Sequence, residues 1–198
     1  MENIDIISRN LEQGIIHLTG EITDLTAVSI MAQLFEMDAR YHDGTKKNDR
    51  IRIYINSPGG SVDAGLAIFD TMQSLQTPVD TVCVGMAASM AAVILAGGDR
   101  RYILPHAEVM IHQPSGGTAG KASDILIAAD HIRERKQVLN QILSDCTGKS
   151  LEEITKDTEL DHWMNADEAT GYGIVDEIIK APIRNRGSVK RRRTKEGA

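Results

Sequence analysis

Cysteine is scarce in this sequence, which has two thiols, Cys83 and Cys146, in 198 residues. Two cysteines cannot form the disulfide framework of a small secreted domain, so a reducing compartment is expected. Long apolar runs are also lacking: the longest candidate, residues 87–96, falls short of the roughly 20 residues that a membrane-spanning helix needs. The first residues, MENIDIISRNLEQG, are polar and acidic, unlike a secretory signal peptide. These absences predict a cytoplasmic protein that does not bind membranes.

Positive charge is concentrated at the C-terminal end of the chain. The formal net charge is -6, but seven of the 22 Lys and Arg residues lie from Arg184 onward. This stretch has no aromatic residue and no apolar periodicity, as is typical of a solvated, disordered tail. A nucleic-acid-binding tail is the alternative, and we favour the solvated one. The sequence therefore predicts one domain over residues 1–183, a disordered basic tail over residues 184–198, and no nucleic-acid partner.

Short runs rich in Ile and Val alternate with segments of helical periodicity. The runs predict strands at residues 15–18, 51–55, 79–84 and 109–111. Apolar residues recur at helical spacing in residues 25–41 and 62–75. This alternation predicts βαβ units and a mostly parallel sheet, and hence an α/β fold.

A long helix is predicted next, over residues 123–146. Its apolar residues are expected to share one face, and Gly148 is a suitable stop. These residues are Ile125, Ala128, Ile132, Leu139 and Leu143. Two short helices should follow, because Ser150 with Glu153 and Asn165 with Glu168 have the spacing of capping boxes. A last strand is expected at residues 174–178.

The segment NSPGGS, residues 56–61, lies between a predicted strand and a predicted helix. Its two glycines allow a sharp turn that exposes backbone N–H groups beside a helix N-terminus, as an oxyanion site requires. An ordinary strand–helix turn is equally compatible with the segment. It lacks the Gly-Lys-Ser/Thr ending of a phosphate-binding loop.

The segment GMAASMAA, residues 85–92, places Ser89 where a predicted strand enters a helix. A serine there faces the positive end of the helix, and the N–H of Met90 could bind an oxyanion. The segment differs from the Gly-x-Ser-x-Gly pattern of α/β-hydrolases, and a serine that only packs is the alternative.

His112 ends the apolar run VMIHQP and could take the serine proton and return it to a leaving group. A structural histidine is the alternative. A third member of a triad would come from Asp157, Glu159 or Asp161, and residue chemistry does not choose among them. No two of the six histidines have the His-x-x-x-His spacing of a helical zinc site, so neither a metal nor another cofactor is expected.

In this order the motifs resemble those of the ClpP family, the proteolytic subunits of ATP-dependent Clp proteases. The resemblance extends from Leu18 to Glu177. It is carried by YINSPGG at residues 54–60, AASMA at 87–91, MIHQP at 110–114, KDT at 156–158 followed by Asp161, and YG at 172–173.

The resemblance implies a ClpP/crotonase-like fold with a projecting handle helix over about residues 113–147. It implies a catalytic triad of Ser89, His112 and Asp161, with oxyanion donors at the N–H groups of Gly60 and Met90. It also implies that Ser115, Gly116 and Gly117 belong to a strand that aligns a peptide substrate.

The family's activity is that of a serine endopeptidase inside a particle of two stacked heptamers, which an AAA+ unfoldase of the ClpX, ClpA or ClpC type feeds with protein substrates. Two departures favour an alternative, a weakly active or regulatory subunit that needs a second ClpP-type chain. Only Met1, Glu2 and Asn3 precede the segment beginning at Ile4, which predicts a shortened N-terminus. Leu160 stands where an arginine is common, which removes a donor for ion pairs between rings. An acyl-CoA enzyme of the crotonase type is disfavoured by the serine and histidine.

Overall fold

A computed structural model describes residues 6–42 and 50–180 of the chain. The predictions for the shortened N-terminus and for the basic tail at residues 184–198 lie outside these residues. Within them, no helix is long and apolar enough to cross a membrane.

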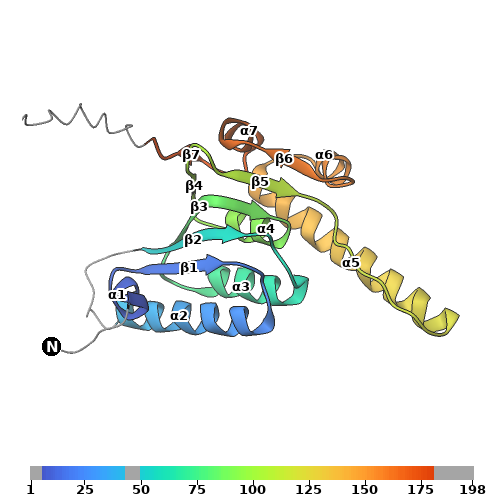
Figure 1. Cartoon of the computed structure of the whole chain (residues 1–198), viewed down its shortest axis with the longest axis horizontal. Coiled ribbons are helices and arrows are strands. Elements are labelled where there is room, and N and C mark those ends of the chain that lie inside the picture. The colour runs from blue at the N-terminus through green and yellow to red at the C-terminus, as the bar shows by residue number, and fades with distance from the viewer. Residues whose placement is uncertain (1–5, 43–49, 181–198) are drawn as a thin grey trace, which may run out of the picture.

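A mixed sheet forms the centre of the structure (Figure 1). Its order is β1-β2-β3-β4-β7, with β5 paired to β3 and to β6. All pairings are parallel except that of β5 with β6, so the predicted mostly parallel sheet is confirmed. The strands are β1 (Ile15–Thr19), β2 (Ile51–Ser57), β3 (Val79–Ala88), β4 (Arg100–Ile103), β5 (Glu108–Ile111), β6 (His162–Met164) and β7 (Glu177–Ile178).

Strand β3 changes partner along its length. Its residues 80–83 pair with β4, and its residues 86–88 pair with β5. A register shift between Ile55 and Ser57 accompanies this change on the β2 side. The divergence brings β5 beside the carboxyl end of β3, where the chain turns into a helix.

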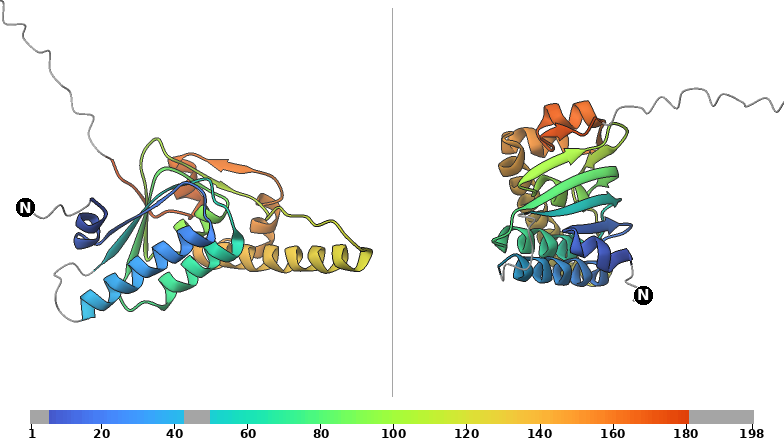
Figure 2. Two further views of the ribbon diagram at one scale, coloured as in Figure 1. Left: turned by 60° about the horizontal axis from the view of Figure 1, so that its bottom comes forward. Right: turned by 90° about the vertical axis from the view of Figure 1, so that its left-hand side faces the viewer.

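Helices pack beside this sheet and extend beyond it. They are α1 (Ile6–Glu12), α2 (Asp24–His42), α3 (Val62–Ser74), α4 (Met90–Ala96), α5 (Ala122–Thr147), α6 (Leu151–Asp157) and α7 (Ala166–Tyr172). Helices α2 and α3 lie side by side along the sheet, and α4, which is buried throughout, packs against β3 (Figure 2). The ends of the predicted helices agree with α2, α3 and α5 to within about two residues.

Helix α5 projects away from the sheet, as the predicted handle does (Figure 1). Only its second half is anchored, through buried Leu139, Asn140 and Leu143. The predicted apolar face of this helix is therefore only partly buried, since Ile125 is 45% exposed. Its neighbours Leu126 and Ile127 are 65% and 69% exposed, respectively. The projecting half thus presents apolar side chains to its surroundings.

Local signals in the C-terminal third were predicted with mixed success. Both capping boxes form, at Ser150 with Glu153 and at Asn165 with Glu168. The last strand is shorter than predicted, because the chain leaves α7 through Gly173 in a left-handed conformation and Ile174 and Val175 pack into the core before β7 begins. Helix α1 and strands β4 and β6 were not predicted.

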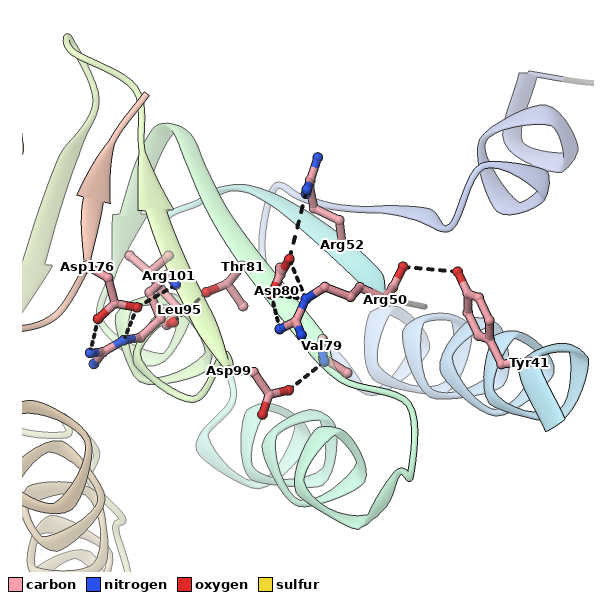
Figure 3. Close-up of polar contacts among 10 residues, drawn as sticks. All are labelled: Tyr41, Arg50, Arg52, Val79, Asp80, Thr81, Leu95, Asp99, Arg101 and Asp176. Carbon is pink, nitrogen blue, oxygen red and sulfur yellow. Dashed lines mark hydrogen bonds and ion pairs between the residues drawn. The ribbon is translucent and has the colours of Figure 1, made fainter. Parts of the chain in front are cut away.

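An ion-pair cluster lies at the amino ends of β2 and β3 (Figure 3). Asp80 is 1% exposed, and both its carboxylate oxygens lie 2.9 Å from the single Nε–H of Arg50, while Nη2 of Arg50 donates to Oδ1. Arg52 approaches the same carboxylate to 3.9 Å. The hydrogen bond to Asp80 raises the pKa of Arg50, and Tyr41 donates to the Arg50 carbonyl. A buried carboxylate is stable only when it is paired in this way.

A second cluster connects the C-terminal elements to the sheet (Figure 3). Arg101 on β4 pairs with Asp176 and also donates to the carbonyl oxygens of Cys146 and Gly173. Although burial acts to raise the pKa of Asp176, its hydrogen bonds with Arg101 lower it. One guanidinium therefore joins β4, the end of α5 and the turn after α7.

We predict that Asp80→Asn destabilises the protein by about 3 kcal/mol, because it removes one partner of a buried ion pair. Asp130→Asn is the matched control: its pair with Arg133 has side chains 66% and 63% exposed, and such pairs contribute at most about 1 kcal/mol. Urea denaturation at one fixed protein concentration measures both changes. Equal losses for the two variants would contradict the interpretation.

Candidate active site

The turn at Ser89 is the most strained point of the described backbone. Strand β3 ends at Ala88 and α4 begins at Met90, so Ser89 alone makes the change of direction. Its φ of 56° is the only positive value of a non-glycine residue in the part of the chain that the structure describes. Such a conformation costs of order 1–3 kcal/mol and persists only where its surroundings impose it. Here the Ser89 N–H donates to the Met110 carbonyl at 2.8 Å, which fixes the turn to β5.

Strand pairing brings Ser89, His112 and Asp161 together. Ala88 pairs with Met110 across β3 and β5, and Ile111 pairs with His162 across β5 and β6. Ser89 directly follows Ala88, and His112 directly follows Ile111. Asp161 directly precedes His162. All three side chains therefore lie at the same edge of the sheet.

A continuous hydrogen-bonded chain links the three side chains. His112 Nε2 lies 2.8 Å from Ser89 Oγ, and His112 Nδ1 lies 3.0 Å from Asp161 Oδ1. Because an ionised carboxylate can only accept, the neutral imidazole carries its proton on Nδ1 and leaves Nε2 to accept from the serine hydroxyl. The His112 side chain is 25% exposed and that of Asp161 is 62% exposed, so the site is open to solvent on the aspartate side.

The other two carboxylates that the sequence left open have different partners. Asp157 accepts a hydrogen bond of 2.9 Å from the Tyr172 hydroxyl. Burial and this hydrogen bond raise the pKa of Tyr172. Glu159 accepts a hydrogen bond of 2.8 Å from Lys136. Of the three, Asp161 is the one in contact with His112.

The glycine turn at residues 56–60 lies against the Ser89 turn. A Cβ on Gly59, which has φ of 91°, would lie 2.6 Å from the Ala88 carbonyl oxygen and 2.8 Å from Ser89 Cβ. A Cβ on Gly60 would lie 2.3 Å from the Ile22 carbonyl oxygen. Both positions therefore need glycine so that the backbone can approach this closely.

Two backbone N–H groups, one in the glycine turn and one at the start of α4, are available to a ligand. Those of Gly60 and Met90 donate to no acceptor within residues 6–42 and 50–180. Gly60 is the residue after Gly59, which lies against the Ser89 turn. The Met90 N–H is the first N–H of α4. Donors of this kind beside a nucleophile form an oxyanion site when both face the same point.

An apolar cavity opens beside Ser89 and His112. Its apolar lining comes from α3, α4, β5 and α5 and the segment after His112, namely Val62, Met90, Val93, Ile111, Pro114, Leu139 and Leu143. Its enclosed volume is about 10 Å³, which is enough for one water molecule. Sequence reasoning did not identify this cavity. The only signal was that Leu139 and Leu143 belong to the apolar face of the long helix.

Ser115, Gly116 and Gly117 are exposed and belong to no strand. The predicted substrate-aligning strand would form by pairing with a bound peptide, so it stays a prediction; within residues 6–42 and 50–180 no strand pairs with this segment. A Cβ on Gly116 would lie 3.2 Å from Ile132 Cδ1, so the segment runs along α5. Its backbone is thus positioned near the histidine without a neighbouring strand.

Metal ligands do not gather anywhere in the described chain. No group of three or more His, Cys, Asp or Glu side chains within residues 6–42 and 50–180 is arranged to hold an ion.

Comparison with known families agrees with this architecture. The sequence model of the Clp protease family matches residues 1–182. The chain therefore belongs to the Clp protease family, and its fold is the ClpP/crotonase-like fold that the sequence predicted.

We predict that Gly59→Ala lowers both the melting temperature and the rate at which a fluorophosphonate probe labels Ser89, since the new Cβ would displace the turn at residues 56–60. The stability loss should exceed about 1 kcal/mol, because an alanine is strained at positive φ. Gly171→Ala is the control: an added Cβ there meets nothing within 4 Å, and the residue lies in α7. A Gly59→Ala protein that is labelled at the parent rate would contradict this view of the turn.

Proposed function

We propose that this Clp protease family member is a serine endopeptidase whose single peptidase domain cleaves peptide bonds with Ser89. The observation that carries the proposal is the hydrogen-bonded chain from Ser89 through His112 to Asp161. Membership of the family supports a ClpP-type peptidase.

In the first step Ser89 Oγ attacks the carbonyl carbon of the scissile bond while His112 Nε2 takes the hydroxyl proton. The carbonyl oxygen becomes an oxyanion, which accepts hydrogen bonds from the N–H groups of Gly60 and Met90. The Asp161 carboxylate stabilises the imidazolium that forms. The intermediate collapses when Nε2 returns the proton to the leaving amine, so the C–N bond breaks and an ester to Ser89 remains.

Water completes the reaction by the same route in reverse. His112 Nε2 takes a proton from a water molecule, whose oxygen attacks the ester carbonyl. The second oxyanion uses the same two N–H groups, and its collapse returns the proton to Ser89 Oγ and releases a carboxylic acid. The histidine and serine end in their starting states.

An extended peptide would bind along Ser115, Gly116 and Gly117. Their free backbone can pair with the peptide as an added strand, which recognises the main chain and is indifferent to most side chains. The side chain before the scissile bond would enter the apolar cavity beside Ser89. Because that cavity has room for only one water, a larger side chain would enter only if its lining residues moved.

The exposed apolar surfaces of this chain favour assembly into rings. On α2, Leu25, Val28 and Phe35 share a helix face and are 83%, 59% and 55% exposed. The projecting half of α5 adds exposed Ile125 to Ile127. Apolar surface of this kind marks protein contacts. We infer a homo-oligomer of two stacked heptamers that receives protein substrates from an AAA+ unfoldase.

A second candidate function rests on Leu160. Its side chain is 80% exposed and directly precedes Asp161. Leu160 offers an apolar contact next to Asp161 that another ClpP-type chain could cover. In that case the chain is a subunit whose activity depends on a second, different subunit.

We predict that Ser89→Ala abolishes hydrolysis of a fluorogenic peptide, with a loss of about 10⁴-fold or more in kcat, because the nucleophile is absent. The melting temperature and the particle size in native mass spectrometry should not decrease, since the change removes one hydroxyl. Activity within tenfold of the parent would show that Ser89 is not the nucleophile.

We predict that Asp161→Asn lowers kcat by roughly 10⁴-fold, because an amide at this position stabilises the wrong imidazole tautomer. Asp157→Asn is the matched control, with its carboxylate bonded to Tyr172 and not to His112. It should leave kcat within a few-fold of the parent. A larger loss of kcat for Asp157→Asn than for Asp161→Asn, in assembled protein, would show that Asp161 is the wrong aspartate.

A further inference from the structure

The side chain of Asp161 has little of its own to hold it in place. It is 62% exposed, and its one hydrogen bond within the described residues is the contact with His112. Packing therefore does not fix the carboxylate, and its position depends on the backbone of residues 158–161.

Gln113 attaches that backbone to the residue after His112. Its N–H donates to the Thr158 carbonyl at 2.6 Å, and its Nε2 donates to the Glu159 carbonyl at 2.8 Å. The segments carrying the histidine and the aspartate are thus joined beyond the end of the β5–β6 pairing.

Lys136 on α5 connects both segments with a single ammonium group. Its Nζ donates to Gln113 Oε1 at 2.9 Å and to Glu159 Oε2 at 2.8 Å. Its side chain is 23% exposed, so these contacts are partly shielded from water.

The part of α5 that carries Lys136 is well anchored. Leu139 and Asn140 are buried one turn further along, and the Asn140 Oδ1 accepts a hydrogen bond of 3.2 Å from Thr158 Oγ1. Lys136 therefore connects the two triad segments to a fixed element. It does not contact Ser89, His112 or Asp161 in any hydrogen bond or ion pair of the described chain.

We propose that Lys136 is a positioning residue that holds Asp161 in register with His112. Without the ammonium group, Gln113 loses a donor and the Glu159 carboxylate, two residues before Asp161, loses its counter-charge. Residues 158–161 then move, and Nδ1 of His112 loses the carboxylate that fixes its tautomer. This inference rests on the proposed peptidase function for its kinetic consequences and on geometry alone for the Asp161–His112 contact.

The kinetic test compares Lys136→Met and Lys136→Arg with a matched control, Lys149→Met, in the full-length assembled protein. Lys149 is also ion-paired, at 3.5 Å to Glu153, and its side chain is 27% exposed. Lys136→Met should lower kcat by about 10²-fold, as misplacement of a catalytic group by about 1 Å does, with KM within twofold. Lys136→Arg should recover part of the loss, and Lys149→Met should resemble the parent. Equal losses for Lys136→Met and Lys149→Met would overturn the proposal.

A double-mutant cycle separates positioning from general stability. In the Asp161→Asn background, Lys136→Met should change kcat by less than about twofold, because the group that it positions is already altered. The same fold-change in both backgrounds would mean that Lys136 acts independently of Asp161, and the proposal would be wrong. If Lys136→Met does not fold, Glu159→Gln replaces it in the same cycle, with the same expected coupling.

Crystal structures of the parent and of Lys136→Met decide the question even for an inactive protein. The Nδ1–Oδ1 contact between His112 and Asp161 should be present in the parent and lost in the variant. A variant that keeps the contact would overturn the positioning role. A parent that fails to hydrolyse any peptide or to react with a fluorophosphonate at Ser89 would instead overturn the proposed function and leave this geometric comparison valid.

Discussion

The pairing of the last residues of β3 with β5 is the interaction on which the site depends. Met110 lies between Ala88 on one side and Trp163 on the other, so one short strand sets the positions of three segments. The bond from Ser89 N–H to the Met110 carbonyl then imposes the strained turn. If β3 kept β4 as its partner throughout, His112 would lie far from the serine. Loss of the three β3–β5 pairings would thus separate Ser89 from His112 while leaving most of the core intact.

Much of the fold and part of the site could be predicted from the sequence. Strand–helix alternation indicated the sheet, and the ends of the runs at residues 79–84 and 109–111 indicated where Ser89 and His112 lie. The carboxylate could not be chosen by this reasoning, because Asp157, Glu159 and Asp161 fall within five residues and the choice depends on a β6 strand of three residues. So short a strand has no detectable periodicity. Resemblance to the family supplied Asp161, and the structure brings it to His112. The contacts of Lys136 could not be found either, since a long side chain reaching two distant segments leaves no pattern in the sequence.

Stability and chemistry lie at opposite ends of the parallel strands. The amino ends of β2 and β3 carry the buried pair of Asp80 with Arg50, whereas the carboxyl ends lead to the glycine turn and Ser89. Parallel strands put all their carboxyl ends at one edge, where ligands bind in α/β folds. The ion pairs at the other edge can therefore fix the sheet without introducing charge beside the Ser89 turn.

The left-handed backbone of Ser89 has a consequence for how such a chain changes over evolutionary time. Glycine adopts this conformation without penalty, so replacing the serine by glycine would relieve strain while removing the hydroxyl that contacts His112. Under the proposed function, selection for catalysis and selection for stability thus oppose each other at one codon. In a lineage whose partner subunits carried out the reaction, we expect glycine to replace the serine and to give a more stable, inactive subunit.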